Sequence, residues 1–258
     1  MGRPVFIAAD WAAPASVVAV TTTRADGSNN LDNGDISGFN LGFGGANPEK
    51  VRANRGRLAR ALGSGLDFQW LQQVHGKRVA QAARTNPACR ADAVFTTESN
   101  LACCVLTADC LPVFFSSIRG DAVAVAHAGW RGLAAGVLEN TVNSLPVAAD
   151  ELLVWLGPAI GPCHFEVGPE VRDAFLSAAT GISEAAVTNC FRQAGGNDRL
   201  LADLYELARL KLKKLGVAAV SGGGLCTYCD PQRFYSYRRE GVTGRMASVI
   251  FRRPSADR

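Results

Sequence analysis

Two segments, TADCLP at residues 107–112 and AHAGWRG at residues 126–132, carry the residues around which this sequence is organised. Each follows an apolar run, so Cys110 and His127 come where a buried strand ends. Strand ends are places where a rigid sheet presents side chains to a cleft. His75 ends a third strand-like run. We therefore group these three residues as catalytic candidates, although most free cysteines are small buried hydrophobes and a lone histidine is usually a turn residue.

Strand-like and helix-like runs surround these segments. We expect strands at Val17–Thr23, Phe68–Val74, Ala91–Thr96, Leu101–Leu106, Pro112–Ile118, Ala122–Ala126, Glu151–Gly157, Val217–Val220 and Met246–Phe251. We expect helices after Asn47, from Leu133 to Val142, from Pro169, and along the apolar stripe from Leu201 to Leu215. Because helices alternate irregularly with paired strands, the predicted fold class is α+β, a layered sandwich of mixed β-sheets flanked by helices.

The charge balance gives little support to nucleic-acid binding. The 258 residues are 48% hydrophobic and 19% charged, and 27 basic minus 23 acidic residues leave a net charge of +4. The densest basic stretch, Arg233 to Arg253, contains aromatic residues, a combination that can stack on single-stranded nucleic acid. Arginines around a small anionic substrate are the preferred interpretation, so we predict no nucleic-acid partner.

The eight cysteines are interpreted as reduced thiols of a cytoplasmic protein. No apolar leader and no run of 18 apolar residues is present, so we expect neither secretion nor a membrane partner. Cys226 and Cys229 form a CxxC without a second pair, which gives a zinc ribbon poor support. Cys163 and His164 follow a Gly/Pro-rich corner, where we expect them to pack and not to take part in the site.

His75, Cys110 and His127 also form a possible metal-binding set. Zinc accepts neutral imidazole and thiolate, and a catalytic zinc keeps three protein ligands with one position open for water. Such a zinc lowers the pKa of the bound water to about 7, which supplies hydroxide at neutral pH. The spacings of 35 residues (110 − 75) and 17 residues (127 − 110) are too long for a local finger. The three ligands would have to meet through tertiary structure.

Several segments resemble one known family. These are QVHG at 73–76, TADCLPV at 107–113, HAGWRG at 127–132 and GPAIG at 157–161, with shorter matches at 23–24, 40–41, 54–55, 234–239 and 243–245. They are similar to the hallmark segments of the multicopper polyphenol oxidase (laccase-domain) family. The resemblance spans nearly the whole chain, so it implies one catalytic domain over residues 1–258. The polar loop from Ala25 to Gly38 departs from the family's Gly-Gly-Val-Ser-like stretch at Ala25 to Ser28.

The resemblance implies an enzyme with a zinc bound by His75, Cys110 and His127. Family members are regarded chiefly as purine nucleoside phosphorylases, which split adenosine, inosine, guanosine and methylthioadenosine with phosphate, and as adenosine deaminases. A metal-bound hydroxide could attack C6 of adenine, as in other zinc deaminases. The implied partners are a nucleoside and phosphate, and we expect a monomer or a small homo-oligomer.

Four further residues are substrate-binding candidates. Arg131, Arg24 and Gln73 are our candidates for holding phosphate and polarising the base, and Asn40 lies in another of the resembling segments. Arg131 stands near a predicted helix start, where the macrodipole disfavours a cation. A structural ion pair is the simpler interpretation of Arg131, and an anion contact is the sharper one.

Three other functions remain open. A copper polyphenol oxidase (laccase) fits the donor set, although one mononuclear set does not easily perform four-electron oxygen chemistry. A metal-free hydrolase could use Cys110 as nucleophile and His127 or His75 as base. The family's fold resembles cysteine deamidase toxins, and some relatives are implicated in editing peptidoglycan precursors. A protein that only binds a partner is the third possibility.

Overall fold

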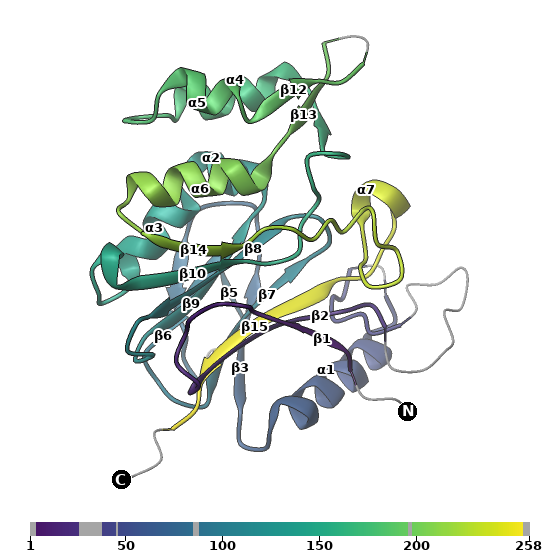
Figure 1. The fold of residues 1–258 in the computed structure, drawn as a ribbon. Helices are drawn as coiled ribbons and strands as arrows, with labels where there is room; N and C mark the ends of the chain where they lie inside the picture. The colour runs from purple at the N-terminus through teal and green to yellow at the C-terminus, as the bar shows by residue number, and fades with distance from the viewer. Residues whose placement is uncertain (1–3, 26–37, 45, 85–87, 196–197, 255–258) are drawn as a thin grey trace.

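The computed structural model describes residues 4–25, 38–44, 46–84, 88–195 and 198–254. The predicted polar loop at 25–38 lies almost entirely outside these residues. Two six-stranded sheets stack as layers, and a small three-stranded sheet stands apart at one end (Figure 1). This confirms the predicted α+β layered sandwich of mixed sheets with flanking helices.

The first large sheet has the order β1-β2-β15-β7-β3-β5. Its strands are β1 (Phe6–Ala8), β2 (Val17–Thr22), β15 (Met246–Arg252), β7 (Leu101–Thr107), β3 (Asp67–Gln72) and β5 (Ala88–Arg90). The pairs from β1 to β7 are antiparallel, whereas β3 runs parallel to both β7 and β5. Helix α1 (Pro48–Leu62) covers the outer face, and Asn47 caps it by accepting from the amides of Glu49 and Lys50.

The second large sheet has the order β14-β10-β8-β9-β6-β4. Its strands are β14 (Ala219–Gly222), β10 (Leu152–Leu156), β8 (Leu111–Ser117), β9 (Val123–Ala128), β6 (Ala93–Thr96) and β4 (Val79–Gln81). Helices α2 (Trp130–Ala135), α3 (Val137–Ser144) and α6 (Leu204–Lys214) pack on its outer face. The small sheet contains β11 (Glu166–Val167), β13 (Leu200–Ala202) and β12 (Phe191–Gln193). It lies beyond α6, together with α4 (Pro169–Ser177) and α5 (Glu184–Thr188) (Figure 1).

The inner faces of the two large sheets share one hydrophobic core. Val105 of β7 and Ile250 of β15 meet Val125 of β9 and Trp155 of β10 there. Side chains alternate between the faces of a strand, so neighbours in sequence enter different cores. The adjacent thiols follow this rule: Cys103 lies between the sheets, and Cys104 lies on the α1 side. The two side chains therefore point away from each other.

Two helix predictions need correction. Leu201, predicted to begin the Leu201–Leu215 helix, belongs to β13, and α6 begins only at Leu204 after the Asp203 cap. The helix expected from Leu133 to Val142 is two helices, because Gly136 adopts φ 100° and separates α2 from α3. The structure also contains elements that were not predicted: β1, β4, β5, β11, β12, β13, α5, the short η1 (Ala149–Glu151) and α7 (Tyr237–Glu240).

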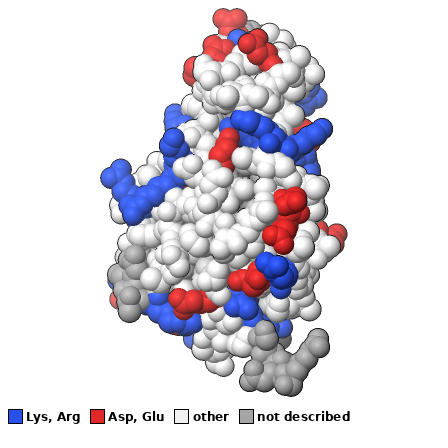
Figure 2. Space-filling view, turned by 90° about the vertical axis from the view of Figure 1, so that its left-hand side faces the viewer, with Lys and Arg blue, Asp and Glu red and all other residues white. Residues whose placement is uncertain are grey.

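Charges are dispersed over the molecular surface. On the face shown in Figure 2, lysine and arginine side chains form separate groups with aspartate and glutamate between them. Within the described part of the chain, none of the helices combines the length and the apolar character that a bilayer span requires.

Candidate active site

The three residues singled out in the sequence come together at one edge of the sandwich. One donor atom from each of His75, Cys110 and His127 lies within 4.8 Å of the others. Cys110 Sγ is 3.9 Å from His75 Nε2, and the two imidazole rings meet edge-on with centroids 4.8 Å apart. His127 is 3% exposed, so the set runs from a buried imidazole to the exposed ring of His75.

The sandwich topology explains this convergence. His75 follows β3 of the first sheet, and Cys110 lies in the connection that carries the chain from β7 of the first sheet to β8 of the second. His127 lies at the end of β9, directly opposite Pro112 in the β8–β9 ladder. Candidate ligands that are far apart in sequence thus meet where both sheets end.

Backbone strain accompanies the site. His75 has φ 58° and Asp109 has φ 97°, values that side-chain-bearing residues rarely adopt. Asp109 is held by the Thr227 hydroxyl, which donates to its carboxylate at 2.6 Å, and by the amide of Arg238 at 2.7 Å. Such strain persists only where surrounding contacts impose it, and it is common at active sites. Here it fixes the directions of His75 and of the residue that precedes Cys110.

Asp92 is a fully buried carboxylate that joins two of the three residues. It accepts hydrogen bonds from the backbone amides of Val74, His75 and Gly76 and from Nδ1 of His127, at 2.7 to 3.3 Å. Burial alone would raise the pKa of Asp92, but the hydrogen bonds from His127 and the amides outweigh it and hold the pKa below its ordinary value. Asp92 therefore fixes the tautomer of neutral His127, in which Nδ1 carries the proton and Nε2 is available to accept a hydrogen bond or bind a metal.

Two positions of the HAGWRG segment have no room for a side chain and therefore require glycine. A methyl group at Gly129 would come within 2.9 Å of Cys110 Sγ and 3.2 Å of His75 Cδ2. One at Gly132 would come within 2.7 Å of the Gly76 carbonyl oxygen. The turn from β9 into α2 can therefore pass directly beside the site only where these positions lack a side chain.

Cys110 and His127 stabilise each other as a thiolate and an imidazolium. Burial opposes ionisation of the thiol, but His127 and His75 stabilise the thiolate and lower the Cys110 pKa to about 6. Burial likewise disfavours the imidazolium, yet the Cys110 thiolate and Asp92 raise the His127 pKa to about 9. The donor set therefore contains an activated thiolate near neutral pH.

The arrangement fits a zinc ion. Zinc bond lengths place a thiolate sulfur and an imidazole nitrogen about 3.5 Å apart in a tetrahedral site, and Cys110 Sγ and His75 Nε2 are 3.9 Å apart. Zinc-binding histidines commonly donate their second ring N–H to a carboxylate, as His127 does to Asp92. The three donors would leave one tetrahedral position open.

A cleft of about 600 Å³ opens above the three residues. Leu71, Phe43, Trp130, Phe165 and Tyr237 supply its apolar and aromatic surface, and Arg131, Arg238 and Arg245 supply positive charge. None of these arginines pairs with a carboxylate of the described chain. The wall also includes Thr107, whose buried hydroxyl has no hydrogen-bond partner among the described residues.

The four predicted substrate residues lie in different settings. Arg131 is exposed and lines the cleft, where its guanidinium stacks on Trp130. Gln73 also lines the cleft, but both ends of its amide are bonded to the backbone of Leu106. Buried Asn40 accepts from the amides of Gly42 and Arg245, so it positions two lining residues.

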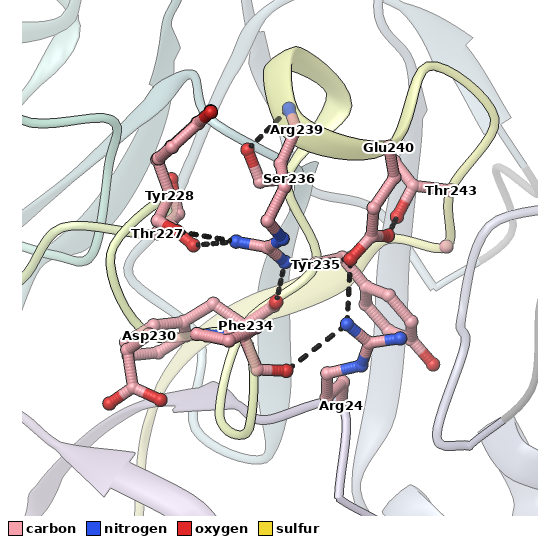
Figure 3. Close-up of polar contacts among 12 residues, drawn as sticks. Arg24, Thr227, Tyr228, Asp230, Phe234, Tyr235, Ser236, Arg239, Glu240 and Thr243 are labelled. Atoms are coloured by element: carbon pink, nitrogen blue, oxygen red, sulfur yellow. Dashed lines mark hydrogen bonds and ion pairs between the residues drawn. The ribbon is translucent and has the colours of Figure 1, made fainter. Parts of the chain in front are cut away.

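Arg24 lies outside the set of cleft-lining residues. Its guanidinium bonds to Glu240 at 2.7 Å and to the carbonyl of Pro231, and it lies over the ring of Tyr235 (Figure 3). In the sequence, an ion pair was the simpler interpretation of Arg131. In the structure it is Arg24 whose guanidinium pairs with a carboxylate.

Three residues of the site were missed in the sequence. Arg238 and Arg245 lie in segments of the family resemblance and within the basic stretch, which was the available signal. Asp92 was assigned to a strand only. The sequence does place this acidic residue within a short apolar run. A carboxylate buried in such a strand must be hydrogen-bonded or paired, and this could have pointed to Asp92.

Comparison with known proteins supports the resemblance. A family model described as multi-copper polyphenol oxidoreductase laccase matches residues 18–253. The chain belongs to this laccase family. A purine nucleoside phosphorylase of Pseudomonas aeruginosa is 49% identical over 247 residues, which covers 95% of this chain and 98% of the relative. Purine nucleoside phosphorylase YfiH of Escherichia coli is 45% identical over 248 residues, with the same coverage.

Solved structures show the same laccase-family fold. A crystal structure of a Neisseria meningitidis protein superposes with a TM-score of 0.88 at 44% identity, and the match covers 96% of this chain and 99% of that one. YlmD from Geobacillus stearothermophilus gives a TM-score of 0.83 at 29% identity, with 93% of each chain covered. The family resemblance and the fold predicted from the sequence are both confirmed.

Proposed function

We propose that this chain is a zinc-dependent purine nucleoside phosphorylase that acts in the cleft above His75, Cys110 and His127. The observation that carries the proposal is one cavity that combines a zinc-type donor set with three arginines, none of which pairs with a carboxylate among the described residues. The relatives named purine nucleoside phosphorylase, at 40 to 49% identity, support the same activity.

The arginines supply the phosphate site in this proposal. Phosphate must be held with one oxygen directed at C1′ of the ribose, and guanidinium groups bind phosphate through paired N–H donors. Arg131 and Arg238 are exposed at the cleft, and Arg245 is half-buried. Arg238 is anchored because its guanidinium donates to the Glu166 carbonyl at 2.7 Å and its amide donates to Asp109. A second positive charge of the cleft is thereby fixed in place.

The aromatic side chains supply the base site. Phe43 and Tyr237 are 44% and 60% exposed, and both line the cleft together with Trp130 and Phe165. Large exposed aromatic rings around a cavity are typical of ligand sites, and a purine offers a flat face on which they can stack. The cavity volume of about 600 Å³ is within the usual range for small-molecule sites.

The reaction joins a phosphate oxygen to C1′ and breaks the bond between C1′ and N9, so that the base leaves with the electron pair and takes up a proton. When bound, zinc would supply a Lewis acid that stabilises developing negative charge. The chain itself holds the donor set rigid through Asp92 and brings phosphate and nucleoside together.

Adenosine deamination is a second proposed activity of the same cleft. Three protein donors leave a tetrahedral zinc with one open position, the arrangement of a catalytic site and not of a structural one. In this reaction water replaces the amino group at C6 of adenine, and ammonia leaves. Phosphate has no part in it, so the two activities can be separated by leaving phosphate out.

The Cys110 hydrolase and the copper oxidase make different predictions. Cys110, His127 and Asp92 are linked in the order nucleophile, base and orienting carboxylate, which a metal-free hydrolase would also need. A hydrolase retains activity after chelation, whereas a copper oxidase consumes oxygen and requires copper. The phosphorylase loses activity on chelation and regains it with zinc.

The deciding experiment is incubation of purified protein with adenosine, with and without phosphate, and separate measurement of adenine, inosine and ribose-1-phosphate. Equal amounts of adenine and ribose-1-phosphate, formed only with phosphate, support phosphorolysis. Inosine formed in both reactions supports deamination. The proposal is wrong if zinc-loaded protein forms neither adenine with ribose-1-phosphate nor inosine, while the Pseudomonas relative is active in the same assay.

A further inference from the structure

A second cluster of metal-binding side chains lies outside the donor set described above. Cys163 and His164 come from the loop that follows β10, and Cys226 and Cys229 come from the loop that follows β14. One donor atom from each of the four lies within 4.8 Å of the others. The CxxC at 226–229 therefore has neighbours in the fold that its spacing in the sequence did not reveal. Cys163 and His164 lie outside the donor set of His75, Cys110 and His127, as expected.

The distances within this cluster are close to those of tetrahedral zinc ligands. Cys163 Sγ lies 3.9 Å from Cys226 Sγ and 3.5 Å from Cys229 Sγ. His164 Nδ1 lies 3.1 Å from Cys163 Sγ and 3.3 Å from Cys229 Sγ. Zinc bond lengths put tetrahedral sulfur atoms about 3.8 Å apart, and sulfur and nitrogen about 3.5 Å apart. We propose that Cys163, His164, Cys226 and Cys229 bind one structural zinc ion.

The surroundings support a bound metal. The amide of Gly161 donates to Cys226 Sγ at 3.2 Å, and hydrogen bonds of this kind stabilise sulfur ligands that carry negative charge. The His164 ring stacks on Tyr228 with centroids 4.0 Å apart and an angle of 17°, which fixes the direction of Nδ1. Two of the four ligands are thus oriented by neighbours that do not bind the metal themselves.

Contacts within the protein hold the two loops together. Ala159 and Cys226 form an isolated β-bridge, and the Tyr205 hydroxyl accepts from the Ala159 amide while donating to the Leu225 carbonyl at 2.6 Å. Arg239 donates to the carbonyls of Thr227 and Tyr228, which lie between the two cysteines of the CxxC (Figure 3). The ligand-bearing turn is therefore preorganised.

The site is closed, and its position suggests what it does. Four protein donors satisfy a tetrahedral zinc and leave no position for substrate, which is typical of structural sites. The loop that carries Cys163 and His164 also places Ile160 and Phe165 in the wall of the cleft. A metal that ties this loop to the β14 loop would keep that wall rigid. The site does not depend on the proposed phosphorylase activity.

A disulfide is the competing state of the same residues. Cys163 and Cys229 are exposed, with sulfur atoms 3.5 Å apart, and an oxidant could join them in place of a metal. A disulfide would consume two thiols and leave the cluster with too few ligands for zinc. Counting zinc ions and free thiols in the same sample separates the two states.

The test measures zinc per chain by mass spectrometry of protein purified under reducing conditions and saturated with zinc before desalting. Wild type should carry two zinc ions. The single variant Cys110→Ala and the double variant Cys163→Ser with Cys229→Ser should each carry one, and their combination none. Cys89→Ser, a half-buried thiol outside both clusters, is the matched control and should keep two.

Cobalt supplies a second readout and guards against a variant that fails to fold. Cobalt-loaded Cys110→Ala protein should show thiolate-to-cobalt charge transfer and intense tetrahedral bands from the remaining site. Cys229→His keeps four ligands, so it should retain the metal while the charge-transfer intensity falls by about one third as one thiolate of three is lost. The proposal is overturned if the double Ser variant binds as much zinc as wild type. It is also overturned if wild type contains only one zinc ion per chain and two of its eight cysteines are not free thiols.

Discussion

The carboxylate of Asp92 and the imidazole of His127 lie 2.9 Å apart, and both side chains are buried. The carboxylate is anchored by three successive backbone amides from Val74 to Gly76, on the segment that carries His75. One carboxylate therefore orients two of the three proposed zinc ligands at once. The strength of the metal site should depend on Asp92 although it is not a ligand.

Replacement of Asp92 by Asn should weaken zinc binding. The amide loses the charge that orients His127, and changes of this kind typically cost about 10- to 100-fold in metal affinity. Competition with a chromogenic chelator measures the change. Asp173→Asn, on an exposed residue of α4, should bind zinc as wild type does. Equal affinity of Asp92→Asn and wild type would argue against an orienting role.

A single methyl group at Gly129 should damage the site. Gly129→Ala would place a carbon 2.9 Å from Cys110 Sγ, so the sulfur must move. Displacements near 1 Å at a reacting centre can cost about 100-fold in rate. Gly44→Ala adds the same group to the same cleft, where nothing lies within 4 Å of it. We expect a loss of kcat/KM near that size for the first variant and little change for the second.

Arg131 and Arg238 should set the phosphate KM. Removal of one charge-assisted hydrogen bond costs about 1.5 to 3 kcal/mol, so Arg131→Ala and Arg238→Ala should each raise that KM by roughly 10- to 100-fold. Arg192→Ala, at an exposed position of β12, is the control. An unchanged phosphate KM in both cleft variants would remove them from the phosphate site.

Arg24→Ala distinguishes a structural from a substrate-binding role. Because Arg24 is bonded to Glu240 and stacked on Tyr235, the variant should unfold at a lower temperature while its phosphate KM stays near wild type. A higher phosphate KM with an unchanged Tm would instead place Arg24 among the substrate-binding residues, as expected from the sequence.

Cys110 in metal-free protein should react at unusually low pH. Its pKa is lowered to about 6, so the thiolate persists at pH 7, where an ordinary thiol with a pKa of about 8.5 is mostly protonated. Iodoacetamide labelling, followed peptide by peptide, should be faster at Cys110 than at Cys89 at pH 7. It should fall as the pH drops through 6 and the thiolate gains a proton. Zinc should block it. A pH profile that matches Cys89 would contradict the thiolate–imidazolium pair.

The sequence indicated the three central residues because each one ends a strand-like run and lies in a hallmark segment. It could not show that His75, Cys110 and His127 meet, since this depends on the chain crossing between sheets at the turn that holds Cys110. The layered α+β fold was predictable from the irregular alternation of strands and helices. The break at Gly136 was not, because it comes from a positive φ inside an apolar helical pattern.

The residues that were missed act through contacts between distant segments. Asp92 accepts hydrogen bonds from the amides that follow β3. It lies beside His127 because β6, which follows Asp92, pairs with β9. The same is true of the second cysteine cluster: the CxxC at 226–229 appears isolated until a loop 63 residues earlier in the chain brings Cys163 beside Cys226. Spacing rules detect ligands that are close in sequence, and here the partners are supplied by packing.

The proposed phosphorylase activity requires a zinc site and a phosphate site that act in one cleft. The most direct test is the rate of ribose-1-phosphate formation from inosine and phosphate by the native protein, by protein stripped of metal with a chelator, and by stripped protein given zinc back. We predict that the rate disappears on stripping, returns with zinc, and never appears in Cys110→Ala. Undiminished formation of ribose-1-phosphate by protein shown to contain no metal would contradict the account.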